Sequence, residues 1–160
     1  MKIFPTNTYD FELLKETSYA LSELEKNTLI TKSIVSEWTY KKFIGQVNEN
    51  GFKIISSKSG RGAFCILEGN LKSKKGILKI RIHKAFKILL SFIYFFPIIG
   101  FTIALFTKEK EIIISLILPT VMCIIVFRFI ITELAFRIIS KNELKKLKEI
   151  IGIKQLKKLQ

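Results

Sequence analysis

One run of hydroxyl, basic and glycine residues comes nearest to the chemistry of a phosphate-binding site. It reads Ser56-Ser57-Lys58-Ser59-Gly60-Arg61-Gly62. Hydroxyls, basic side chains and glycine backbone N–H groups are donors that cradle phosphates. The run lacks the G-x-x-x-x-G-K-[ST] spacing of a P-loop, and the segment after it is predicted to be a strand, not a helix. We therefore expect a polar hairpin loop, which could still contact a lipid headgroup or a ligand phosphate.

His83 is the single histidine of the chain and the side chain best suited to proton transfer near neutral pH. Its neighbours are Arg81, Lys84 and Lys87, with no acid nearby in sequence to orient the imidazole. We expect a surface histidine at a membrane interface, with a general base or a pH sensor as the alternative. The sequence shows no paired carboxylates, metal-ligand spacing or nucleophile motif. The prediction is a non-enzymatic protein with no catalytic residues, no metal site and no cofactor.

Apolar and basic residues occupy separate segments of the chain, and this separation predicts the helices that follow His83. The 160-residue chain is 49% hydrophobic and carries a formal net charge of +14. The apolar residues concentrate between positions 88 and 131, and basic residues lie on both sides. This pattern predicts a transmembrane hairpin over 86–136, with spans at about 88–106 and 112–132. Pro97 and Pro119 are expected to kink the two spans, and Arg128 to lie near the inner end of the second, where its side chain can reach the headgroups.

The basic flanks predict how the hairpin is oriented. Positions 72–87 contain seven Lys or Arg and no acid, and positions 137–160 contain eight Lys or Arg against two Glu. Because basic flanks stay in the cytoplasm, both termini are expected there, with the hairpin in the plasma (inner) membrane. The residues expected to meet the interface or the anionic headgroups are Lys72, Lys74, Lys75, Arg81, Lys84, Lys87, Arg128, Lys145, Lys146 and Lys157.

Residues 1–85 have the pattern of a small cytoplasmic α+β domain. Alternation over 8–13 predicts a strand, and a short helix with Thr17 or Ser18 as its cap should run to about residue 27. Asn50-Gly51 between two alternating runs predicts a β-hairpin. Strands are also expected over 63–71 and 77–83, the second with Leu78, Ile80 and Ile82 on its buried face. Together these segments predict an antiparallel sheet of about four strands, in addition to the strand over 8–13.

The C-terminal segment 137–160 is predicted to be one basic amphipathic helix. Ser140 and Glu143 have the spacing of a capping box, and leucines and isoleucines follow at helical intervals. Such a helix next to a span is expected to lie on the anionic cytoplasmic leaflet, with packing against a partner helix or an oligomer as the alternative. Nucleic acid is not expected as a partner, because membrane flanks already account for the charge.

The strand pattern resembles a group of small bacterial membrane proteins. The resemblance rests on Phe43-Ile44-Gly45-Gln46-Val47, on Gly51-Phe52-Lys53-Ile54, on residues 66–71 and on Gly76 to His83, which together follow an F-x-G-x-V…F-x-I…G-x-I arrangement ahead of hydrophobic spans. An Arg-Asn-Ser-Phe-x-Pro run of the group is replaced here by residues 60–65. The resemblance implies the fold and brings no activity with it.

Taken together, the sequence predicts a membrane-anchored, non-enzymatic cytoplasmic binding or regulatory module. Its expected partners are the bilayer and its anionic headgroups, with a protein partner or a homo-oligomer in addition. The first alternative is a membrane-active effector or a small oligomeric channel, because both spans contain a proline and Arg128 interrupts the second. The second alternative is an enzyme on lipid substrates that uses His83 and the basic residues around it.

Overall fold

The structure, a computed structural model, describes residues 4–31, 39–57, 64–107 and 110–159. Its contacts divide the chain into two compact units. Unit 1 contains Met1–His83 and Phe136–Gln160, and unit 2 contains Lys84–Ala135. The C-terminal segment therefore packs with the N-terminal part of the chain and shares its core.

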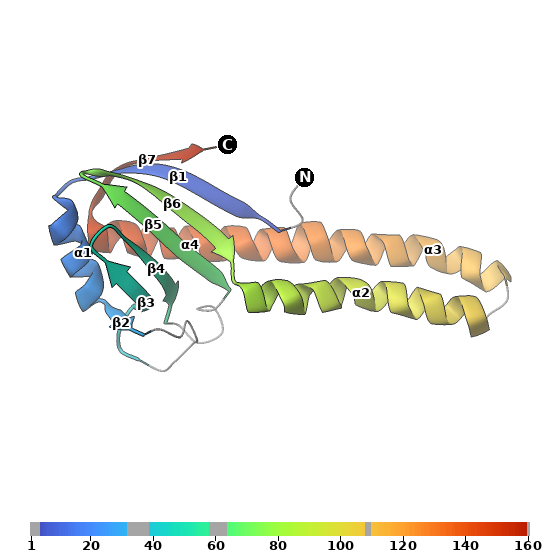
Figure 1. Cartoon of the computed structure of the whole chain (residues 1–160). Coiled ribbons are helices and arrows are strands. Elements are labelled where there is room, and N and C mark those ends of the chain that lie inside the picture. Colours follow the sequence, from blue (N-terminus) through green and yellow to red (C-terminus); the bar gives the residue numbers. More distant parts are fainter. Residues whose placement is uncertain (1–3, 32–38, 58–63, 108–109, 160) are drawn as a thin grey trace. The chain divides into compact units, whose positions relative to one another are not determined.

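A seven-stranded sheet forms unit 1 within the described residues, with strand order β2-β3-β4-β5-β6-β1-β7 (Figure 1). Only β2 and β3 pair in parallel among these strands, and the other neighbours are antiparallel. The fold class α+β is confirmed at this level, and the sheet is larger than the sequence predicted. The strands are β1 (Thr6–Leu13), β2 (Thr28–Ile30), β3 (Phe43–Asn48), β4 (Gly51–Ser56), β5 (Cys65–Lys72), β6 (Lys75–Ile82) and β7 (Ile153–Leu159).

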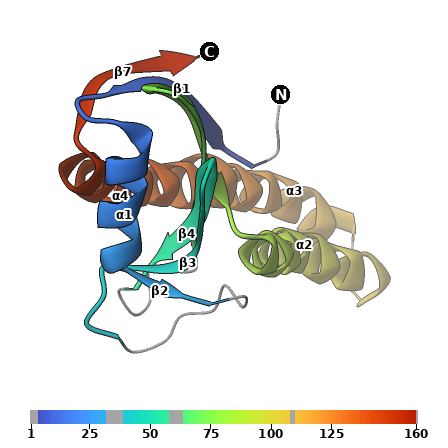
Figure 2. The same cartoon turned by 60° about the vertical axis from the view of Figure 1, so that its left-hand side comes forward.

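Helix α1 (Thr17–Lys26) and the unit 1 part of helix α4 (Glu133–Ile151) lie on the same face of this sheet (Figure 2). The core between them is apolar, and its fully buried side chains include Leu24 of α1, Leu147 of α4 and Phe43, Ile54 and Ile80 of the sheet. Alternation along β6 places Leu78, Ile80 and Ile82 in this core, as predicted. The opposite face holds a smaller buried cluster of Ile44, Ile55 and Ile66.

The predicted hairpin between β3 and β4 is present, but its turn lies one residue earlier than expected. Asn48 pairs with Gly51, so Glu49 and Asn50 occupy the turn. Neither has a positive φ, so the conformation expected for an Asn-Gly turn is not used. Gly51 has a different role: a Cβ on it would lie 2.3 Å from the carbonyl oxygen of Gly69 in β5. Glycine is needed there for close backbone approach, not for the turn.

The prediction of a single helix over 137–160 is wrong beyond Ile151. Gly152, with φ of +66°, ends α4 in the left-handed conformation that glycine adopts at helix C-termini. The chain then continues as β7, which pairs with β1 and buries Ile153. The predicted capping box does not start a helix either, because Ser140 and Glu143 lie inside α4 with both residues buried.

Unit 2 is a helical hairpin. Helix α2 (Lys84–Thr107) packs against helix α3 (Lys110–Ile125), which continues through the π-helical segment η1 (Val126–Thr132) into α4. Both helices are long and apolar enough to cross a membrane by length and composition. The 24 residues of α2 give a length of about 36 Å. Phe92, Phe96, Phe106 and Leu118 are each at least 71% exposed, so the hairpin presents apolar side chains outward.

Candidate functional site

An open groove on unit 1 lies between α1 and the turn from β3 to β4. Its volume is about 850 Å³. Helix α1 contributes residues at i, i+3, i+4 and i+7 of one stripe, and the β-hairpin contributes the end of β3 and both turn residues. The lining residues are Ser18, Leu21, Ser22, Glu25, Val47, Asn48, Glu49 and Asn50.

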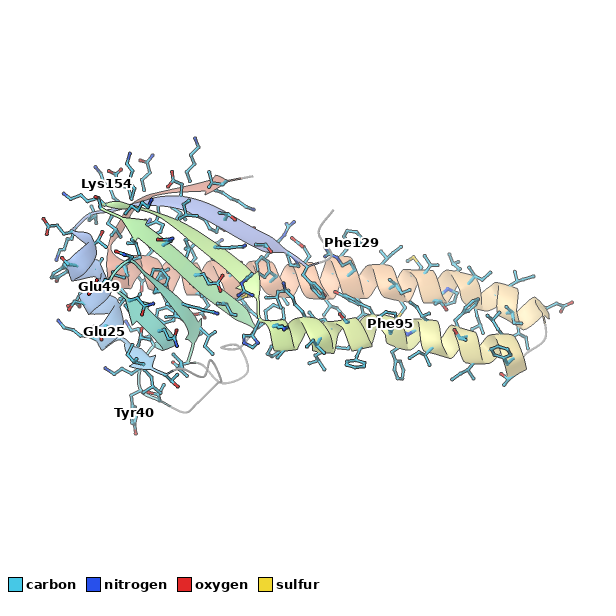
Figure 3. All side chains as sticks on the ribbon, viewed as in Figure 1. Glu25, Tyr40, Glu49, Phe95, Phe129 and Lys154 are labelled. Atoms are coloured by element: carbon cyan, nitrogen blue, oxygen red, sulfur yellow. The ribbon has the colours of Figure 1, made fainter. Side chains whose placement is uncertain are left out.

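The charged residues that line this groove are both acidic. Glu25 and Glu49, labelled in Figure 3, are exposed and form no ion pair with the residues that the structure describes. Lys26, next to Glu25 in sequence, is held by Glu23 at 2.8 Å. Leu21 is 6% exposed and forms part of an apolar floor. In a chain with 27 basic and 13 acidic residues, this local excess of carboxylates suits a cationic side chain whose aliphatic stem packs on Leu21 and Val47.

A second polar cluster is buried between α4 and the sheet. Lys146 Nζ lies 2.7 Å from Glu143 Oε1 and donates to Ser56 Oγ at 3.2 Å. Burial, and then the charge of Glu143, raise the pKa of the nearby Cys65 thiol to about 12. Ser56 and Cys65 are 0% and 1% exposed. A serine next to a lysine can act as a nucleophile, but this serine is inaccessible and this lysine is already paired with a carboxylate.

The outer face of the sheet carries an ion-pair network. Arg81 on β6 binds Glu68 on β5 through two hydrogen bonds, 2.6 Å from Nη2 to Oε1 and 3.0 Å from Nε to Oε2. Lys53 Nζ lies 3.8 Å from Oε1 of the same carboxylate. The hydrogen bonds from Arg81 lower the pKa of Glu68 against the opposing effect of burial, and they raise the pKa of Arg81. Arg81, predicted to meet headgroups, is thus engaged within the sheet.

His83 follows β6 on the same side of the sheet as Arg81. Burial is the largest cause that lowers its pKa, and the positive charges of Arg81 and Lys53 add to the effect. The imidazole is therefore neutral at neutral pH. A neutral imidazole can accept a proton, but the charged groups that affect its pKa, Arg81 and Lys53, are both cations.

The structure separates the residues predicted to form one interface. Lys72, Lys74 and Lys75 lie at the turn between β5 and β6, whereas Arg81 lies near the other end of β6. Seven residue steps separate Lys75 from Ile82, roughly 23 Å along the strand. The remaining predicted residues of unit 1 also differ in environment, with Lys145 exposed on α4, Lys146 directed into the buried cluster and Lys157 on β7 opposite Asp10. Lys84 and Lys87 lie in the first turn of α2.

Arg128 lies in the π-helical segment, in a polar cluster that the sequence did not indicate. Its Nη1 is 3.7 Å from Glu133 Oε2. Thr132, only 1% exposed, donates to the Phe127 carbonyl five residues earlier, at 3.0 Å, and its Oγ1 is 2.5 Å from Tyr94 Oη on α2. The i, i+5 contact is that of a π-helix, a feature often found at functional sites. Helical spacing alone does not show where a π-segment will form.

The two prolines of the hairpin line one shared cavity of about 280 Å³ between α2 and α3. Its other lining residues are Gly100, Phe101, Leu116, Thr120 and Cys123. Thr120 Oγ1 donates to the Leu116 carbonyl at 2.8 Å, so the hydroxyl is satisfied within its own helix. The cavity is therefore mostly apolar. Pro97 and Pro119 do lie in α2 and α3 as expected from the sequence.

Positions 58–62 of the run expected to form a polar hairpin loop lie outside the described residues. Ser56, which is described, ends β4 and points into the buried cluster, so it is not available to a phosphate at the surface. The acidic groove was not foreseen. The only signal for it in the sequence is the pair of serines at i and i+4 on the otherwise charged side of α1.

Comparisons with family models, with curated proteins and with solved structures found no significant match for this chain.

Proposed function

We propose that this chain is a membrane-anchored, non-enzymatic module whose unit 1 binds a protein partner through the acidic groove. The observation that carries the proposal is the groove itself: about 850 Å³, open, floored by Leu21 and Val47 and flanked by the carboxylates of Glu25 and Glu49. This arrangement suits a basic segment of a partner. The hairpin supplies the anchor, since both of its helices are long enough and apolar enough to cross a bilayer.

The environment of the reactive side chains supports a binding role over catalysis. Cys65 is buried and its pKa of about 12 keeps it protonated at neutral pH. Ser56 is buried beside a lysine that already pairs with Glu143. A nucleophile needs access to its substrate and a base free to accept its proton, and this cluster offers neither.

The orientation is part of the proposal. Basic residues flank both ends of the hairpin, so we place the hairpin in the plasma (inner) membrane with both termini in the cytoplasm. Cationic side chains, among them the exposed Lys84 and Lys145 and the half-buried Lys87, would then contact anionic headgroups. Resistance of the protein to alkaline extraction, with reporters at both termini active only in the cytoplasm, is the expected result. Extraction at high pH would contradict the anchor.

Site-specific photo-crosslinking tests the binding role. A photo-reactive residue at Ser22, which lines the groove, should give a discrete cross-linked product in native membranes. The matched control is the same residue at Lys79, which is exposed on the outer face of the sheet. Equal products from both positions, or none from Ser22, would rule out the groove as the binding surface.

A second candidate is a membrane-active effector or a small oligomeric channel. The cavity lined by Pro97 and Pro119 and the π-helical segment around Arg128 favour it, because both depart from a simple anchor. Two helices are too few to enclose a pore, so several chains would have to assemble. Ion flux through liposomes containing the purified protein, abolished by Arg128→Gln, would support this function. Liposomes that stay sealed at high protein density would exclude it.

A further inference from the structure

The acidic groove of unit 1 lies beside a turn with the opposite charge. The turn between β5 and β6 carries three exposed lysines, Lys72, Lys74 and Lys75. It lies at the same end of the sheet as the turn between β3 and β4, next to α1 (Figure 1). The two charged surfaces are therefore neighbours on one end of unit 1.

Two contacts hold the basic turn next to the groove, and a third fixes it to β1. The hydroxyl of Thr17, the residue before Ser18 of the groove, donates to the Ser73 carbonyl. The backbone N–H of Leu71 donates to the carbonyl of Asn50, also a groove residue, at 2.8 Å. The N–H of Leu13 donates to the Lys74 carbonyl at 2.8 Å, which fixes the turn to β1.

Neighbouring patches of opposite charge make a surface that is complementary to itself. A two-fold axis between them places the lysines of each chain against the carboxylates of the other, and such an isologous interface closes after two chains. Lysine also suits the groove in shape, because its ammonium group can reach Glu25 or Glu49 while its methylenes pack on Leu21. The net charge of the chain is +14, but it does not oppose the contact between a lysine and the groove. Lys26, the lysine next to Glu25, is already paired with Glu23.

We infer that the partner of the acidic groove is a second copy of this chain, which inserts its Lys72–Lys75 turn in a reciprocal dimer. The inference rests on the proposed binding role of the groove and names its occupant. It requires no contact from the hairpin.

Charge reversal with complementation tests the dimer. The variants are Glu25→Lys with Glu49→Lys, and Lys72→Glu with Lys74→Glu, each in the full chain in nanodiscs or detergent. Each variant alone should dimerise at least roughly tenfold more weakly than the native chain, because like charges then face each other. An equimolar mixture of the two should restore dimers, since both contacts are again between opposite charges. This rescue also shows that each variant is folded.

A matched control reverses two charges elsewhere on unit 1. Lys145 and Lys148 are exposed on α4, and their double replacement by Glu should leave the dimer unchanged. The dimer should weaken with added salt, because the paired groups are exposed. A native chain that stays monomeric at high density, or a dimer that both reversals leave intact, overturns the inference. If Ser22 cross-links to a different protein while the chain is monomeric, the binding role stands and the second copy is excluded; no cross-link at all rejects both.

Discussion

Lys146 on α4 donates a hydrogen bond to Ser56 on β4, with 3.2 Å between Nζ and Oγ, although 90 positions separate the two residues in the chain. Lys146 also pairs with Glu143, whose side chain is 4% exposed. Glu143 Oε2 has no hydrogen-bond partner among the atoms of the described residues. A buried carboxylate thus depends on one lysine for charge compensation, and the same lysine fastens the C-terminal helix to the middle of the sheet.

Replacing Lys146 alone should therefore be more harmful than replacing both partners. Lys146→Met leaves the buried charge of Glu143 without a partner, and we expect it to lower the free energy of unfolding by roughly 2–4 kcal/mol, somewhat less than a fully buried pair because the lysine is partly exposed. The double variant Glu143→Met with Lys146→Met should recover most of this loss. Denaturant titration followed by circular dichroism measures both. Equal stability of Lys146→Met and the native chain would show that the pair contributes nothing.

The Glu68–Arg81 pair should make unit 1 sensitive to acid. The pKa of Glu68 is lower in the folded protein than in the unfolded chain, so its contribution to stability is present above the ordinary carboxylate pKa and is lost as the pH falls through the folded value. Glu68→Gln should lower the free energy of unfolding by about 1 kcal/mol at pH 7, which is the size expected for a partly exposed bidentate ion pair. Below pH 4 the difference in free energy of unfolding between the variant and the native chain should shrink. A difference that stays constant from pH 7 to pH 3 would contradict this account.

The turn between β5 and β6 contains a strained residue that glycine should relieve. Ser73 has φ of +54°, the left-handed region that residues with a Cβ seldom adopt. Ser73→Gly should stabilise the protein by about 0.5–1 kcal/mol, seen as a rise of roughly 1–4 °C in Tm. Ser73→Ala is the matched control, because it removes the hydroxyl but keeps the Cβ, and its Tm should not rise. The lysines on both sides are unchanged, so the dimer test can use the glycine variant as its background.

Local patterns were enough to predict much of the sheet and the hairpin. Leu78, Ile80 and Ile82 alternate with charged residues, and a one-residue shift would have exposed all three, so the buried face of β6 could be read directly. The length of the apolar run likewise indicated two long apolar helices. In both cases the information lies within one element.

Features that depend on distant partners could not be predicted in the same way. Leu156 and Leu159 are three residues apart, which fits one face of a helix. Only pairing with β1, whose partner residues lie 145 and 151 positions earlier, makes this segment a strand. The acidic groove likewise requires α1 and the Glu49–Asn50 turn to be adjacent, and no periodicity reports that adjacency. Lys146 was assigned to the headgroups because its neighbours are basic, whereas its real partners are Glu143 and Ser56.

The two cysteines give a direct measure of whether the core of unit 1 is closed. In a Cys123→Ser background, Cys65 is the remaining thiol; it is 1% exposed, and its pKa of about 12 leaves only about one thiol in 10⁴ ionised at pH 8. A water-soluble maleimide should therefore modify it at least roughly 10³-fold more slowly than a free cysteine of ordinary pKa. Lys146→Met, which loosens the contact between α4 and β4, should raise the rate, whereas Lys145→Met, at an exposed position of the same helix, should not. Fast labelling of the otherwise native chain would show that Cys65 is open to solvent, and the Ser56–Cys65 region would then be accessible to a substrate.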